Sequence, residues 1–219
     1  MISVTHLGHA CVLLELGHGD SGERILIDPG LYSTGFEGLT GLDAVLVTHA
    51  HADHADLLRL PALMAANAGA RLLVDADTAK QDGMADLALA AQVVADGDIV
   101  AVGDTAVAVV GGPHAVVHPS LPNVTNNGYR LDDLVFHPGD SLDLPSGRVR
   151  VLLLPVGGPW MKLAEAIEYM LRAEAEVVVP IHQAGLAAAH QQLHHQLLRA
   201  VAPAGTRVEV LEPGVARTF

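Results

Sequence analysis

Short apolar runs separated by glycine-rich turns open the chain. Residues 2–7, 11–16 and 24–27 have the length and apolar content of strands, and a continuous apolar run at 44–47 follows the glycine-rich residues 31–42. A short continuous apolar run bounded by turn residues is typical of a buried strand. We therefore expect a sheet in this part of the chain, with residues 31–42 forming a loop that could lie over a pocket.

The rest of the chain predicts helices that alternate with strands. Helices are expected over residues 55–68, 78–91, 163–173 and 187–201. Strands are expected over residues 71–74, 149–154, 176–179 and 208–211, with hairpins within 92–110 and 128–137. Both halves of the chain thus combine strands with helices, and no linker separates them. This order predicts one α/β domain over residues 1–219, a four-layer αββα sandwich of two sheets between helices.

The charge and the cysteine content restrict the partners. With 12 Lys and Arg against 25 Asp and Glu, the formal net charge is −13, so we expect no nucleic-acid partner. The sequence contains no uninterrupted run of about 18 apolar residues, so we expect no membrane span. The first residues lack the features of a signal peptide. The single cysteine, Cys11, is compatible with a reducing cytoplasm. We expect a cytoplasmic protein with a small-molecule substrate that could form a homo-oligomer.

Four metal-competent side chains fall within six residues directly after the apolar run that ends at Val47. The segment reads Thr48-His49-Ala50-His51-Ala52-Asp53-His54. A strand would send His54 to the face opposite the other three, whereas a loop can gather all four around one centre. Imidazole and carboxylate suit zinc, manganese or iron(II), and the absence of thiolates argues against a structural zinc finger. A histidine-rich surface loop that binds nothing is the less favoured interpretation, because a buried strand leads into the segment.

This His-x-His-x-Asp-His segment after an apolar strand resembles the signature of the metallo-β-lactamase superfamily. The resemblance covers essentially the whole chain and implies the αββα fold. It also implies two divalent metal ions, Zn²⁺ first, with Mn²⁺ or Fe²⁺ as alternatives. In that family the first two histidines bind one metal and the Asp-His pair binds the other. Three further ligands come later in the chain: a histidine, a bridging aspartate and a last histidine.

Three residues at the ends of predicted strands match these later positions. A predicted strand leads into the turn Gly111-Gly112-Pro113, and His114 directly follows that turn. His118 is the alternative third histidine or a pocket residue. Asp140 follows an apolar strand and is the candidate bridge, since a carboxylate can hold two cations. His182 ends the run Val177-Val178-Val179-Pro180-Ile181. The resemblance therefore implies one metal on His49, His51 and His114. It implies a second metal on Asp53, His54 and His182, with Asp140 as the bridge between the two metals.

Other segments resemble the branch of the superfamily that includes ascorbate-6-phosphate lactonase. They are Gly8-His9-Ala10, Ile27-Asp28-Pro29 and Pro155-Val156-Gly157-Gly158. The resemblance implies that His9 and Asp28 lie near the metals. The chain departs from that branch at Pro159-Trp160-Met161-Lys162, where Trp160 and Lys162 either shape the substrate pocket or only pack at a helix start.

These features favour a metal-dependent hydrolase that uses a metal-bridged hydroxide on a small ester, lactone, amide or phosphodiester. Asp53 is the candidate catalytic residue that ligates and orients the hydroxide or accepts its proton. We find no arrangement that indicates a serine nucleophile. The alternatives are an iron-dependent redox enzyme of the same fold and a non-catalytic metal-dependent binding protein. A nuclease is disfavoured by the lack of a basic path.

Overall fold

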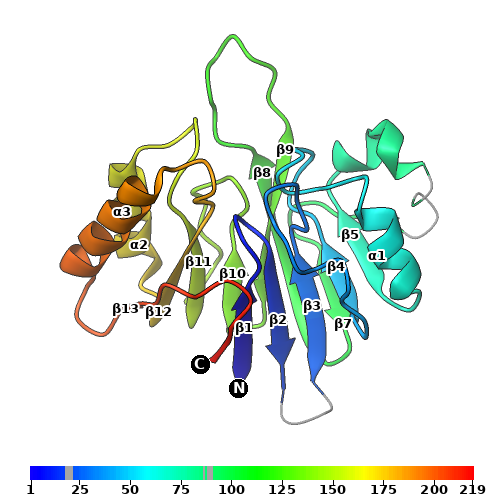
Figure 1. Ribbon diagram of the computed structural model, residues 1–219, viewed down its shortest axis with the longest axis horizontal. Helices are drawn as coiled ribbons and strands as arrows, with labels where there is room; N and C mark the ends of the chain where they lie inside the picture. Colours follow the sequence, from blue (N-terminus) through cyan, green and yellow to red (C-terminus); the bar gives the residue numbers. More distant parts are fainter. Residues whose placement is uncertain (18–21, 86, 88–90) are drawn as a thin grey trace.

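Two sheets of seven strands each pack face to face, with helices on the outer sides (Figure 1). The computed structural model describes residues 1–17, 22–85, 87 and 91–219. The first sheet has the strand order β14-β1-β2-β3-β4-β5-β6 and the second the order β13-β12-β11-β10-β9-β8-β7. The predicted single-domain αββα sandwich is therefore confirmed.

The first sheet is built mainly from the first half of the chain. Its strands are β1 (Ile2–His6), β2 (Val12–Leu16), β3 (Glu23–Ile27), β4 (Ala44–Leu46), β5 (Arg71–Val74), β6 (Ala91–Val93) and β14 (Ala216–Thr218). The second sheet contains β7 (Ile99–Val102), β8 (Thr105–Pro113), β9 (Thr125–Leu131), β10 (Val135–His137), β11 (Val151–Pro155), β12 (Val177–Ile181) and β13 (Arg207–Val208). The α-helices are α1 (Leu60–Ala66), α2 (Leu163–Ala173) and α3 (Ala188–Val201).

The alternation of side chains along the strands divides the core into three layers. In β11, Val151 and Leu153 point between the sheets, whereas Leu152 and Leu154 point toward α2 and α3. In β2, Leu14 lies between the sheets and Leu13 lies on the side of α1. Because both faces of these strands are covered, their sequences are apolar throughout rather than alternating.

Several predicted boundaries were wrong for identifiable reasons. The helix expected over 55–68 begins only at Leu60, since the Asp56 carboxylate accepts the backbone N–H groups of Leu58 and Arg59 and holds a turn there. Pro61 lies in the first helical turn, where a missing N–H costs nothing. Within 92–110 only β7 and β8 form the expected hairpin, because β6 joins the first sheet beside β5.

The helix expected over 78–91 is replaced by two short 3₁₀ helices, Thr78–Lys80 and Asp82–Met84. Gln81 between them is extended, with ψ of 140°, so the α-helical pattern is interrupted. Residues 86 and 88–90 of this predicted helix lie outside the described residues. The edge strand β14 was not predicted from the sequence. None of the helices in the described part of the chain is both long and apolar enough to cross a membrane.

The segments that follow β1, β3, β4, β8, β10 and β12 meet at one edge of the sandwich. Backbone hydrogen bonds join these segments. His182 N–H donates to the His9 carbonyl at 2.7 Å, between the two sheets, and Ala115 N–H donates to the Asp140 carbonyl at 2.8 Å, between segments that follow strands of the second sheet. The long loop between β8 and β9 rises at the same edge, at the top of Figure 1. Parallel strands place their carboxyl ends together, and this is the usual position of a site in sheets of this kind.

Candidate metal centre

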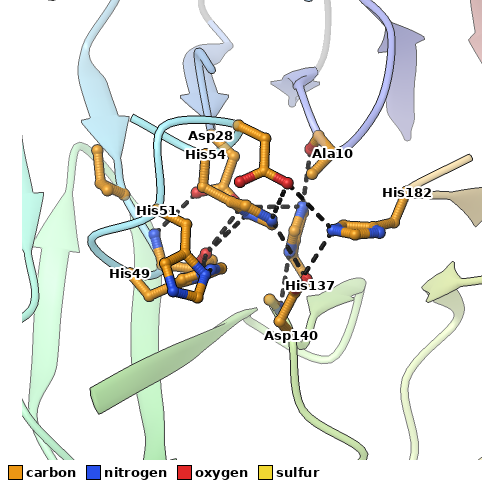
Figure 2. A network of polar contacts seen from close by, with 12 residues as sticks. Ala10, Asp28, His49, His51, His54, His137, Asp140 and His182 are labelled. Carbon is orange, nitrogen blue, oxygen red and sulfur yellow. Dashed lines mark hydrogen bonds and ion pairs between the residues drawn. The ribbon is translucent and has the colours of Figure 1, made fainter. Parts of the chain in front are cut away.

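The segment 48–54 leaves β4 and turns back on itself, as the loop interpretation predicts. The N–H groups of His54 and Ala55 both donate to the His51 carbonyl, at 3.0 and 2.9 Å. The Gln81 side chain donates to the Ala50 carbonyl at 2.7 Å and anchors the outer side of the turn. This fold brings His49, His51 and His54 close to one another (Figure 2), and Asp53 lies within 4.8 Å of His54.

Three histidines form a first group of possible metal ligands. Ring nitrogens of His49, His51 and His114 lie within 4.8 Å of one another. His49 Nδ1 lies 3.0 Å from the Thr48 hydroxyl, and His114 Nδ1 bonds the Ala115 carbonyl, so each ring presents Nε2 to the centre. His49 Nε2 is 3.0 Å from His51 Nδ1, a spacing suited to two ligands of one cation.

A second group contains His9, Asp53, His54 and His182. His182 Nδ1 donates to the Gly157 carbonyl, and His54 Nδ1 lies 2.7 Å from Asp28 Oδ2. A hydrogen bond at one ring nitrogen sets the tautomer and turns the other nitrogen toward a metal. His9 Nε2 lies 3.0 Å from Asp53 Oδ2, so His9 joins the group and does not merely stand behind it.

Asp140 lies between the two groups. Its Oδ2 atom is 3.3 Å from His114 Nε2 and 3.1 Å from His182 Nε2, while its Oδ1 atom is 3.2 Å from His54 Nε2. Asp140 is buried, and its backbone N–H donates to the Asn126 side chain at 3.0 Å. The carboxylate therefore reaches one histidine of the first group and two of the second.

Four buried polar atoms at this centre have no hydrogen-bond partner among the described residues. They are His54 Nε2, His114 Nε2, His182 Nε2 and Asp140 Oδ1. His54 Nε2 lies 3.2 Å from Asp140 Oδ1, within the range of an ion pair. Unpartnered buried polar groups are rare in folded proteins. Ligands of a tetrahedral zinc lie about 3.3 Å apart when each is about 2.0–2.1 Å from the metal. The residues present thus fit a bound metal.

Three residues of the site adopt a backbone conformation that L-amino acids rarely use. The φ angles of His9, Asp28 and His182 are 50°, 52° and 62°. The left-handed region costs about 1–2 kcal/mol for a residue with a side chain. Such conformations persist where the surrounding structure enforces them, and they concentrate at functional sites.

Burial and neighbouring charges favour the metal-binding protonation states of His49, His51 and Asp140. Burial lowers the pKa of His49 and of His51, so both rings are neutral at neutral pH. Burial would lower the pKa of His54 as well, but the neighbouring Asp140 and Asp28 outweigh it and raise that pKa. Burial alone would raise the pKa of Asp140, but the neighbouring His54 and His182 outweigh it and lower that pKa well below its usual value. Neutral imidazole and ionised carboxylate are the forms that bind metals.

The two weakest candidates among the predicted residues lie apart from the cluster. His118 is exposed and its Nδ1 accepts from Ser120, so His114 and not His118 completes the first group. Lys162 is exposed at the start of α2, and within the described residues no hydrogen bond or ion pair joins it to the cluster. Trp160, in contrast, donates its indole N–H to Asp140 Oδ2 at 2.7 Å.

Sequence reasoning missed two residues that support the cluster. The Thr48 hydroxyl donates to Asp28 Oδ2 at 2.8 Å and also lies beside His49 Nδ1. The Tyr32 ring packs edge-on to His9, with 5.4 Å between centroids. Thr48 directly precedes the histidine segment, which was a usable signal, whereas nothing in the local pattern marked Tyr32.

The comparisons with known proteins agree with this geometry. The family described as "Beta-lactamase superfamily domain" matches residues 3–182. Protein Rv0786c of Mycobacterium tuberculosis is 43% identical over 188 residues, which is 84% of both chains. A UPF0173 metal-dependent hydrolase of Aeropyrum pernix is 28% identical over 248 residues, covering 100% of this chain and 98% of the relative.

The fold is also that of solved structures. Igni18, a metallo hydrolase from Ignicoccus hospitalis, superimposes with a TM-score of 0.71 at 24% identity, covering 100% of this chain and 99% of that chain. The match over residues 3–182 and the close mycobacterial relative lead to one conclusion: this chain belongs to the beta-lactamase superfamily.

Proposed function

We propose that this chain is a dinuclear metal-dependent hydrolase of small esters, lactones or amides. The observation that carries the proposal is the set of unpartnered buried atoms around Asp140: His54 Nε2, His114 Nε2, His182 Nε2 and Asp140 Oδ1. A cation would satisfy each of them. His49, His51 and His114 would hold one ion and Asp53, His54 and His182 the other, with Asp140 shared between them.

The bound ions would act as Lewis acids and lower the pKa of bound water to about 7. The protein's own contribution centres on Asp53. Its side chain is 26% exposed, against 4% for Asp140, so Asp53 is the more accessible of the two acidic ligands. Burial alone would raise the pKa of Asp53. The hydrogen bond with His9 and the neighbouring His54 outweigh burial and lower this pKa below its usual value, so Asp53 is ionised. A carboxylate with a lowered pKa is a weak base, so we assign Asp53 the role of orienting the attacking water.

The distribution of positive charge favours a carbonyl substrate over a phosphodiester. All 12 Lys and Arg residues lie in the described ranges, and no hydrogen bond or ion pair there joins one of them to the seven candidate ligands. Arg59, which follows the metal loop, is already bonded to Asp56 and Glu37. Phosphate recognition in proteins relies on Arg and Lys.

We extend the proposal to the branch of the superfamily, the metal and the cellular location. Gly8-His9-Ala10 and the glycine pair at 157–158 support a branch similar to ascorbate-6-phosphate lactonase. The absence of Lys or Arg contacts to the candidate ligands among the described residues argues against a phosphorylated substrate. Zinc is our first choice of metal, with manganese or iron as alternatives, because imidazole and carboxylate suit all three. A cytoplasmic location agrees with the single, buried Cys11.

Metal content and hydrolysis, measured together, test the proposal. Protein purified without chelator should contain about two zinc or manganese ions per chain and should hydrolyse p-nitrophenyl esters or lactones faster than bis-p-nitrophenyl phosphate. Asp140→Ala should lower both metal content and hydrolysis. Asp98→Ala, at an exposed turn between β6 and β7, should change neither. One or more iron ions with a visible absorption band would instead favour redox chemistry. Failure to take up any metal on reconstitution would overturn the proposal.

A further inference from the structure

Trp160 is in direct contact with the carboxylate that lies between the two candidate metal groups. Its indole N–H donates to Asp140 Oδ2 at 2.7 Å, and the residue is 9% exposed. Its ring lies edge-on to one histidine of each group: the centroids are 6.0 Å from His114 and 6.1 Å from His182. Trp160 therefore contacts the centre of the cluster and not only its margin.

An indole N–H is a donor only, so it must meet an acceptor lone pair. It occupies one of the two lone pairs of Oδ2 and leaves Oδ1 with no donor, 3.2 Å from His54 Nε2. The indole thus holds the carboxylate with Oδ1 beside His54 and with Oδ2 3.1 Å from His182 Nε2 and 3.3 Å from His114 Nε2. From this geometry we infer that Trp160 is a positioning residue that fixes the orientation of Asp140 for metal binding, an inference that rests on the proposed dinuclear site.

The turn that precedes Trp160 is shaped to place this N–H. The carbonyl of Gly157 accepts from His182 Nδ1, so the turn orients a second ligand at the same time. A Cβ on Gly158 would lie 2.7 Å from Trp160 Nε1, closer than real contacts allow. Glycine at 158 therefore leaves the space that the indole needs. The φ angle of Gly158 lies outside the left-handed region, so alanine can adopt it.

Zinc affinity in a Trp160→Phe variant tests the inference. Phenylalanine keeps an aromatic ring and removes the donor. Loss of a group that orients a metal ligand typically weakens metal affinity about 10–100-fold, and we expect this range for zinc, measured by equilibrium dialysis with elemental analysis. The matched control is Tyr169→Phe, which also removes a buried donor from this region, here bonded to the Asp143 carbonyl at 2.7 Å, and should stay within about twofold of wild type.

Gly158→Ala provides a second variant that keeps the tryptophan and displaces its N–H. Because Trp160 is the only tryptophan, its fluorescence reports on this position alone. Emission of the wild-type protein should change on zinc addition in step with zinc uptake, and Gly158→Ala should need at least about tenfold more zinc for the same change. Gly69→Ala is the matched control, since a Cβ there meets nothing within 4 Å.

The outcomes separate this inference from the proposed function. If wild-type protein binds about two zinc ions and both Trp160→Phe and Gly158→Ala bind with affinity within twofold of it, the positioning role is overturned and the proposed function stands. A loss in Tyr169→Phe as large as in Trp160→Phe would also overturn the role, because any buried donor would then suffice. If wild-type protein takes up no zinc, the proposed function fails and the inference fails with it.

Discussion

His54 Nδ1 lies 2.7 Å from Oδ2 of Asp28, and neither side chain has any solvent exposure. The same carboxylate accepts the N–H of Thr48 at 2.8 Å and its hydroxyl at 2.8 Å. Asp28 thus holds both the ring of a candidate ligand and the start of the metal loop. This arrangement of carboxylate, histidine and metal is a recurrent way to fix ring orientation and raise ligand basicity.

Asp28→Asn should weaken metal affinity about 10–100-fold without preventing folding. The amide keeps one acceptor but cannot satisfy both Thr48 and His54, and asparagine tolerates the left-handed φ of 52° at this position. Zinc affinity by equilibrium dialysis is the measurement. Asp132→Asn is the control, because Asp132 also has a φ of 49° and accepts a backbone N–H, but at an exposed hairpin turn. Equal affinity in Asp28→Asn and wild type would contradict the role of Asp28.

Gly30→Ala should disrupt the metal loop through direct contact with its backbone. A Cβ at this position would lie 1.8 Å from the Asp53 carbonyl oxygen and 2.5 Å from the His54 nitrogen. Overpacking typically costs about 1–3 kcal/mol, so we expect the free energy of unfolding of the metal-free protein to fall by at least that amount in urea titrations, with weaker zinc binding.

Gly38→Ala is the matched control for Gly30→Ala. Gly38 belongs to the same connection between β3 and β4, yet a Cβ there meets nothing within 4 Å. This control should leave both the unfolding free energy and the zinc affinity unchanged. A Gly30→Ala protein as stable as Gly38→Ala would contradict the close contact between Gly30 and the backbone of Asp53 and His54.

Stability should decrease with rising pH above about 8.5 because of Cys11. Burial, helped by the nearby Asp28, raises the pKa of the Cys11 thiol well above its usual value, so the folded chain keeps a proton that the unfolded chain loses. The unfolded state is then favoured by up to about 1.4 kcal/mol for each further pH unit. Below that pH both states keep the proton and no dependence arises from this group.

Urea titrations of metal-free protein at pH 8.5 and 9.5 measure this effect. Cys11→Ala lacks the thiol, so its unfolding free energy should change less over this interval than that of wild type. The difference between the two slopes isolates Cys11 from the buried tyrosines, whose raised pKa values act on both proteins alike. Identical slopes would contradict a buried, protonated thiol in the folded state.

Arg59→Lys should loosen the loop that carries Tyr32. The guanidinium donates to the carbonyls of Gly30 at 2.8 Å and Ser33 at 3.0 Å, and to Asp56 at 2.6 Å. Lysine cannot match this planar set of donors. Since Arg59 is 27% exposed, we expect a modest loss of about 1 kcal/mol and faster chymotryptic cleavage within residues 30–37.

Arg148→Lys is the control for Arg59→Lys. Arg148 is 78% exposed and pairs with Glu174 at 3.8 Å, so its replacement should alter neither stability nor cleavage. Cleavage of Arg59→Lys at the wild-type rate would mean that the loop is held by its other contacts, such as the bond from the Ser33 hydroxyl to the Gly8 carbonyl.

The sequence alone was sufficient for the layered fold and for the types of residue at the site. Continuous apolar runs such as Val151–Pro155 encode strands buried on both faces, and this requirement is local. For this reason the two-sheet sandwich was predictable. The group of segments that meets at its edge was predicted from the resemblance of their motifs to the metallo-β-lactamase superfamily.

Only the tertiary structure decided which side chains meet within that edge. His114 and His118 lie four residues apart in one loop, and local pattern cannot say which of them turns inward. The choice follows from the Ala115 bond to Asp140, a contact between the ends of β8 and β10. The contact of Trp160 with Asp140 and the assignment of β6 to the first sheet depend equally on distant partners. Spacing along a chain fixes which face a residue occupies, but packing between elements fixes what it touches.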